Sequence, residues 1–168
     1  MSTSFTSRPA FNHVGISVPD CDAAVQWYNK TFGYELLRPV LHVKRKEMPE
    51  AFIFKIFDEA LKEFKIAWLV SENCAVGLEL FQFIEPKHRR PEGSEFDYCR
   101  SGFFHVSITV QDPVAVSEVV VAGGGSKLAE PVSMPWGNVV VYVRDPWGNT
   151  IELLDGTFRQ IVSAGQSQ

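Results

Sequence analysis

Two histidines and two glutamates occupy matched positions in the two halves of this 168-residue chain. The stretch FNHVGISV at residues 11–18 returns 92 residues later as FFHVSITV, which places His13 against His105. Near the end of each half, the matching tripeptides LEL and IEL place Glu79 against Glu152. Repetition on this scale predicts two copies of one supersecondary unit. Each copy carries a histidine on its first strand and a glutamate on its last.

In each half, the histidine and the glutamate are predicted to lie on the sheet face opposite the apolar residues. Successive residues of a strand point to opposite faces, so His13 lies opposite the apolar set Val14, Ile16 and Val18. If the two units curl against each other, two imidazoles and two carboxylates meet. Such a mixed nitrogen and oxygen set suits a divalent first-row ion such as Zn, Fe, Mn, Co or Ni. Four protein ligands leave an octahedral ion two positions for substrate oxygens, where it acts as a Lewis acid.

The elements that must position these residues follow from local patterns. Asp20 is a good N-cap for a helix over 21–32, and Gly33 ends that helix. The second half repeats the arrangement with a helix over 112–122. Alternating and β-branched stretches predict the strands, which we expect at 11–18, 34–43, 65–70, 76–83, 103–110, 126–129, 139–144 and 149–154, with a loop at 131–137.

This order predicts an α+β fold made of two βαβββ modules. The first module covers residues 9–84, a linker covers 85–102, the second module covers 103–156, and a tail covers 157–168. The offset between the halves falls from 92 at the histidines to 73 at the glutamates, so the first module holds 19 extra residues. We place this insertion near 48–64, where we expect a helix and a lid or substrate-shaping role.

Composition excludes several classes of protein. Sixteen basic and 20 acidic residues give a net charge of −4, which offers no electrostatic basis for binding nucleic acid or an anionic membrane. The basic run at residues 87–90 reads as a solvated part of the linker. The three cysteines, Cys21, Cys74 and Cys99, form no CxxC pair. We expect a reduced cytoplasmic protein, with Cys21 a small core residue.

From Phe11 to Leu154 the chain resembles the vicinal oxygen chelate superfamily, which includes glyoxalases, bleomycin-resistance proteins and extradiol dioxygenases. The HVGISV opening, the DPWGNTIEL close and the His–Glu–His–Glu order carry the resemblance. It implies a cup of paired βαβββ modules with one divalent metal ion. The ligands implied are His13, Glu79, His105 and Glu152. It also implies a small-molecule substrate and a homodimer.

Within this superfamily, lactoylglutathione lyase and methylmalonyl-CoA epimerase are similar in ligand number. The resemblance then implies proton transfer next to a carbonyl, with the metal stabilising an enolate or enediolate and Glu152 or Glu79 as the base. Extradiol dioxygenases usually use two histidines and one glutamate, here His13, His105 and Glu152, and the presence of Glu79 argues against that class. A metal-free protein that sequesters an apolar or aromatic ligand is the third reading.

The chain departs from the glutathione-using pattern at two positions. Small bacterial glyoxalases typically carry Arg where this chain has Ser17, and Asn where it has Phe83. Both changes remove polar partners for glutathione. Phe81 and Phe83 share the face of Glu79 and indicate a hydrophobic or aromatic substrate. Trp136 lies where family members close over the ligand, so we predict that Phe81, Phe83 and Trp136 contact substrate.

Overall fold

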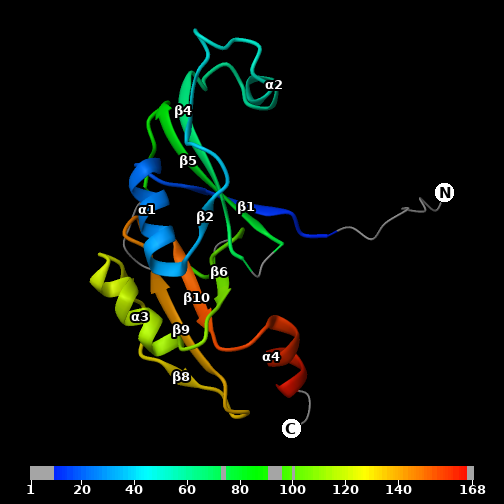
Figure 1. The fold of residues 1–168 in the computed structure, drawn as a ribbon, viewed down its shortest axis with the longest axis vertical. Helices are drawn as coiled ribbons and strands as arrows, with labels where there is room; N and C mark the ends of the chain where they lie inside the picture. The colour runs from blue at the N-terminus through cyan, green and yellow to red at the C-terminus, as the bar shows by residue number, and fades with distance from the viewer. Residues whose placement is uncertain (1–9, 73–74, 91–95, 100, 166–168) are drawn as a thin grey trace, which may run out of the picture. The chain divides into compact units, whose positions relative to one another are not determined.

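The computed structural model describes residues 10–72, 75–90, 96–99 and 101–165. It divides into unit 1, Met1–Arg89, and unit 2, Arg90–Gln168. Each unit contains one five-stranded mixed sheet (Figure 1). In unit 1 the elements are β1 (His13–Ser17), α1 (Cys21–Phe32), β2 (Glu35–Leu36), β3 (Leu41–Lys44), α2 (Ile53–Ile56), β4 (Glu63–Val70) and β5 (Gly77–Glu85). In unit 2 they are β6 (Val106–Thr109), α3 (Pro113–Ala122), β7 (Ser126–Lys127), β8 (Val132–Ser133), β9 (Val139–Arg144), β10 (Thr150–Leu154) and α4 (Phe158–Gly165).

The two sheets have the same topology. In unit 1 the order is β1-β5-β4-β2, with β1 parallel to β5, and β3 also pairs with β4. In unit 2 the order is β6-β10-β9-β7, with β6 parallel to β10, and β8 also pairs with β9. Because β2 and β3 pair with successive parts of β4, they form one interrupted edge strand, and β7 and β8 do the same along β9. Each unit is therefore a βαβββ module, which confirms the predicted α+β fold.

The two main helices form where their caps predict. The Ala23 N–H donates to Asp20 Oδ1 at 3.0 Å, and Gly33 ends α1 with a φ of 70°, a backbone conformation that glycine adopts without strain. Cys21, Ala24, Trp27 and Tyr28 form its buried side. In α3 the Ala115 N–H donates to Asp112 Oδ1 at 2.9 Å. In both units, therefore, an aspartate cap sets the residue at which the helix after the first strand begins.

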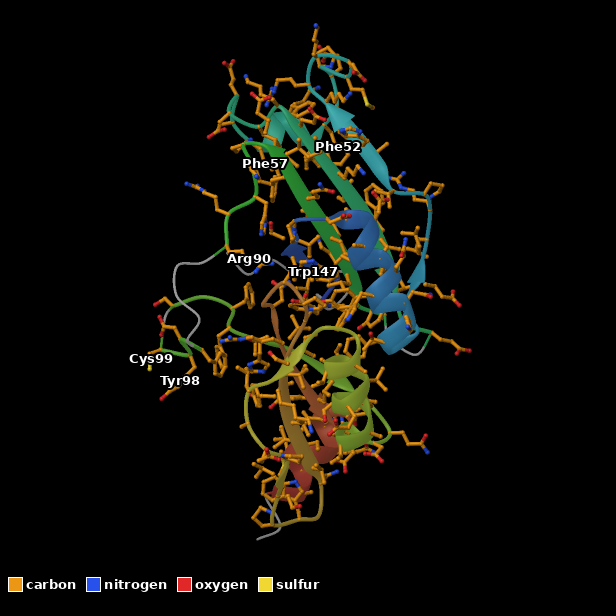
Figure 2. All side chains as sticks on the ribbon, turned by 90° about the vertical axis from the view of Figure 1, so that its left-hand side faces the viewer. Phe52, Phe57, Arg90, Tyr98, Cys99 and Trp147 are labelled. Atoms are coloured by element: carbon orange, nitrogen blue, oxygen red, sulfur yellow. The ribbon has the colours of Figure 1, made fainter. Side chains whose placement is uncertain are left out.

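Residues 45–62 join β3 to β4, and the expected insertion near 48–64 falls largely in this segment. Its helix α2 has only one turn. It lies near the open end of the long β4–β5 hairpin, away from the turn that joins the two strands (Figure 1). Ile53, Phe54 and Leu61 are buried in a cluster with Val43, Phe64 and Ile66 of the sheet. Phe52 and Phe57 project from the same segment with larger exposed fractions (Figure 2). This segment is thus held against β3 and β4 by a hydrophobic cluster that it shares with them.

Several local predictions need correction. The strand expected at 34–43 is broken into β2 and β3, and the loop expected at 131–137 contains the short strand β8. The tail contains α4, which buries Ile161 because that side chain packs against Gly156. Strand pairs of two residues and a helix with one deeply buried side chain leave weak sequence patterns, and for this reason they were missed.

The cysteines behave as a core residue and a surface residue. Cys21 is fully buried, and burial raises the pKa of its thiol to about 12, so the thiol is protonated and inert near neutral pH. Cys99 is exposed beside Tyr98 on a loop of unit 2 (Figure 2). Cys74 lies outside the described residues. Within the described ranges, no helix has the length and apolar character needed to cross a membrane.

Candidate active site

In unit 1, His13 and Glu79 meet on one face of the sheet, which we call the site face. The Nε2 atom of His13 lies 3.3 Å from Oε2 of Glu79. The other ring nitrogen, Nδ1, donates to Oδ1 of Asn12 at 2.7 Å. That bond fixes the imidazole so that Nε2 faces the carboxylate. Unless a proton or a metal cation lies between them, a nitrogen lone pair and a carboxylate oxygen repel each other at this distance.

Unit 2 places His105 and Glu152 in the same arrangement. The Nε2 atom of His105 lies 3.5 Å from Oε2 of Glu152. The imidazole packs edge-on against Phe104 and Tyr142, with ring centroids 4.5 and 5.4 Å away. Its Nδ1 atom is buried and has no hydrogen-bond partner among the described residues. Aromatic packing, rather than a hydrogen bond, therefore orients this histidine.

Strand register explains why both pairs form. Gly15 lies opposite Glu79 across β1 and β5, and Ser107 lies opposite Glu152 across β6 and β10. In each unit the histidine is two residues before that position. His13 begins β1, whereas His105 stands directly before β6 rather than within the expected strand. Residues two positions apart in extended chain point the same way, so each histidine reaches diagonally to its glutamate. Both pairs follow from one strand register, repeated.

A donor on the neighbouring antiparallel strand holds each glutamate. Trp68 on β4 lies opposite Glu79, and its indole Nε1–H donates to Glu79 Oε1 at 2.8 Å. Tyr142 on β9 lies opposite Glu152, and its hydroxyl bonds the Glu152 carboxylate. Burial, and then this hydrogen bond, raises the pKa of Tyr142 to about 12, so the hydroxyl keeps its proton. Hydrogen-bonded partners of this kind orient the ligands of metal sites.

Sequence reasoning missed both donors. Their only signal in the sequence was an aromatic residue on the strand before each glutamate, at the position that pairs with it in the hairpin. Arg38, also missed, stacks over the Trp68 ring, with its Cζ 3.7 Å from the ring centroid. A cation in this position stabilises the indole through its π face. Trp68 is thus held between Arg38 and Glu79.

Within each pair, the distance between the nitrogen and the oxygen is close to that of two ligands on one metal ion. Ligands that each lie about 2.1 Å from one ion, at angles between about 90° and 110°, are roughly 3.0–3.4 Å apart. The observed separations of 3.3 and 3.5 Å are close to this range. Each unit contributes one imidazole and one carboxylate, half of the predicted ligand set. In the described part of the chain, no three His, Cys, Asp or Glu side chains are grouped so as to hold a metal.

The predicted substrate residues have different surroundings. Phe81 and Phe83 stack in parallel on the site face of unit 1, with centroids 5.7 Å apart and planes 8° apart. Phe57 of the insertion packs edge-on against Phe83 at 6.4 Å, whereas Phe81 borders Gly15 next to Glu79. Trp136 of unit 2 packs against Gly165 of α4. Phe81 is therefore the aromatic side chain adjacent to the His13–Glu79 pair, and contact of all three with substrate stays a prediction.

Two histidines outside the ligand set have local partners. His42 pairs with Glu63 at 2.7 Å, and its strand neighbour Val43 belongs to the buried cluster, so His42 lies on the opposite face from that cluster. His88, expected in a solvated linker, shares a hydrogen bond of 2.9 Å with Ser17. The charged neighbours of His88 in the sequence hid this contact.

Solved structures with the same fold carry glyoxalase-family names. A glyoxalase family protein from Bacillus cereus superposes with a TM-score of 0.73 at 18% identity, covering 90% of this chain and 97% of its own. A glyoxalase I mutant from Zea mays gives a TM-score of 0.59 at 23% identity, covering 88% of this chain and 45% of its own. At these identities the likeness shows the fold: paired βαβββ modules of the glyoxalase type.

The family follows from the sequence match. Residues 10–153 match the model of the Glyoxalase/Bleomycin resistance protein/Dioxygenase superfamily, and the chain belongs to it. A 2-epi-5-epi-valiolone epimerase from an Actinomyces species is 29% identical over 151 residues, which are 87% of this chain and 79% of that protein. A putative lactoylglutathione lyase from Brassica oleracea var. gemmifera is 30% identical over 145 residues. That match covers 86% of this chain but only 43% of the plant protein.

Proposed function

We propose that the chain is a metal-dependent isomerase or lyase that moves a proton on the carbon next to a carbonyl group of a small molecule. His13, Glu79, His105 and Glu152 would hold one divalent ion, with zinc, nickel, cobalt, manganese and iron as the candidates. When bound, such an ion polarises a carbonyl oxygen as a Lewis acid. The observation that carries the proposal is the equivalent His–Glu pair in both units, at 3.3 and 3.5 Å.

The donors to the two glutamates support different roles for them. An indole N–H only donates, so Trp68 favours a Glu79 that remains an acceptor and a ligand. A phenol hydroxyl both donates and accepts, so Tyr142 can remain bonded to Glu152 before and after that carboxylate takes a proton. We therefore assign the proton transfer to Glu152 and the holding of the ion to Glu79 and the two histidines.

The names of the relatives support this class of reaction, since they include an epimerase and lactoylglutathione lyases. Glutathione is a poor match for unit 1. Ser17 stands where the resemblance implies an arginine, and it is bonded to His88. Phe83 stands where the resemblance implies an asparagine, and its ring packs against that of Phe57. We propose a substrate other than a glutathione adduct.

Exchange of carbon-bound hydrogen for deuterium tests the proposal. The metal-loaded protein is incubated in D₂O with 2-hydroxy ketones and, separately, with methylglyoxal plus glutathione, and proton NMR follows the signal next to the carbonyl. We expect exchange that stops after chelation and returns with added metal. Absence of exchange with every probe and metal would contradict the proposal. Oxygen uptake with ferrous ion and a catechol would indicate a dioxygenase instead, and chelator-insensitive ligand binding a sequestering protein.

A further inference from the structure

Ser17 and His88 form a second polar pair in unit 1. Their Oγ and Nδ1 atoms share a hydrogen bond of 2.9 Å, and both residues are partly buried. The backbone N–H of His88 donates to the carbonyl of Phe83 at 2.9 Å, whereas that of Val18 donates to the carbonyl of Phe81 at 2.8 Å. Beyond Val18 the chain leaves the edge of β5, and the backbone of His88 bonds the next carbonyl along that edge. Its imidazole is held against Ser17 by a defined backbone contact.

This pair lies on the site face, at a fixed spacing from Glu79. Ser17 has the same strand parity as His13 and therefore points to the same side of β1. In the register of β1 and β5, Gly15 is opposite Glu79 and Ser17 is opposite Phe81. Two residues of strand place Ser17 about 7 Å along the sheet from the level of Glu79.

Between the two polar pairs, β1 presents a position without a side chain. Gly15 is exposed, and a Cβ built on it would lie 3.8 Å from Cε2 of Phe81, an ordinary van der Waals contact. On the site face, the surface between Glu79 and Ser17 is therefore formed by the backbone of Gly15. The ring of Phe81 borders this strip. Polar groups stand at both ends of the strip and an apolar ring along its side.

We propose that Ser17 binds an oxygen at the far end of the substrate and that His88 is a positioning residue for the Ser17 hydroxyl. This inference rests on the proposed function, which places the reacting carbonyl at the His13–Glu79 end. A serine hydroxyl both donates and accepts, so a neutral hydroxyl is its natural partner. The carbon skeleton packs against Phe81. The substrate class is a neutral polyhydroxylated ketone, in ring or chain form, about 7 Å long.

Two ring ketones that differ only in their hydroxyl groups test this assignment. The probes are 2-hydroxycyclohexanone and pentahydroxycyclohexanone, and ligand-observed NMR measures their Kd values on the metal-loaded chain of 168 residues. We expect the pentahydroxy ring to bind more tightly, and Ser17→Ala to weaken it by about 3- to 12-fold, the range for one lost hydrogen bond. The affinity of 2-hydroxycyclohexanone should not change. An equal effect on both rings, or on neither, would overturn the inference.

Matched variants separate binding from folding. Ser17→Thr retains the hydroxyl and should retain the preference. His88→Ala should lose it, and His88→Asn, whose amide nitrogen can replace Nδ1, should restore part of it. Gly15→Ala, which the open space at that position accommodates, should weaken both rings. A negatively charged sugar acid that binds more tightly than the neutral ring would overturn the assigned class.

The two proposals fail separately. A preference for the pentahydroxy ring that depends on Ser17, without any exchange of the proton next to its carbonyl, would contradict the proposed function and leave this inference standing. Exchange with 2-hydroxycyclohexanone, without any preference for the hydroxylated ring, would contradict this inference alone. Metal content and the thermal unfolding midpoint of each variant confirm that the compared proteins are folded and loaded.

Discussion

The His–Glu pair of unit 1 is more exposed and more firmly hydrogen-bonded than the pair of unit 2. The exposed side-chain fractions are 47% and 22% for His13 and Glu79, and 25% and 16% for His105 and Glu152. Asn12 fixes the His13 ring, whereas aromatic rings surround His105. One strand register thus produces two chemically different pairs, because the neighbouring residues have diverged. In the proposed function, Glu79 of unit 1 would hold the ion and Glu152 of unit 2 would move the proton.

The largest expected effect separates the two glutamates. With saturating metal, we expect Glu152→Gln to lower the rate of proton exchange by about 10²–10⁴-fold, since it removes the base. Glu79→Gln should instead weaken metal binding and recover most of its activity as the metal concentration rises. Exchange rates measured across a metal titration distinguish the two. If Glu79→Gln is the variant that excess metal cannot rescue, the assignment of the base is reversed.

A second comparison concerns the insertion, which unit 2 lacks. Phe54 is buried beside Phe64, with ring centroids 6.1 Å apart, so Phe54→Ala should lower the free energy of unfolding by about 3–5 kcal/mol. Phe52 is 72% exposed, and Phe52→Ala should change that free energy by less than about 0.5 kcal/mol. Urea denaturation of both variants gives the measurement. Equal small effects would show that the insertion is a mobile lid rather than part of the core.

Smaller losses of activity or metal affinity are expected from the aromatic donors than from the glutamates. Trp68→Phe and Tyr142→Phe each remove one hydrogen bond to a glutamate while keeping an aromatic ring. Losses of about 10- to 100-fold are typical for such partners. We expect Trp68→Phe to act mainly on metal affinity and Tyr142→Phe mainly on the exchange rate at saturating metal. Identical profiles for the two variants would remove the distinction between the units.

The repeat, the caps and the strand alternation were enough to predict the βαβββ order and the face that carries each histidine. Asp20 and Gly33 are local signals, and a period of two residues is insensitive to tertiary context. The expected insertion near 48–64 rests on the offset between the two halves, which falls from 92 at the histidines to 73 at the glutamates. These features depend on residues that are close in sequence or repeated.

The contacts made by single side chains were not predictable in the same way. Trp68 and Tyr142 reach their glutamates across a hairpin, so the contact depends on the register of the turn. His88 reaches Ser17 over 71 positions of sequence, from within a run of basic residues typical of a linker. The sequence pattern marks neither contact, since each depends on where the backbone returns to the sheet.

The proposed function requires that His13, Glu79, His105 and Glu152 hold one metal ion, and the metal content of the protein tests this proposal most directly. The chain is purified without a metal-chelating tag and analysed for divalent metals alongside His13→Ala and His105→Ala. We predict about one equivalent per chain, lost in both variants, because removal of one ligand weakens the whole site. Two equivalents per chain, or an ion retained after either substitution, would show that the His–Glu pairs do not share a site.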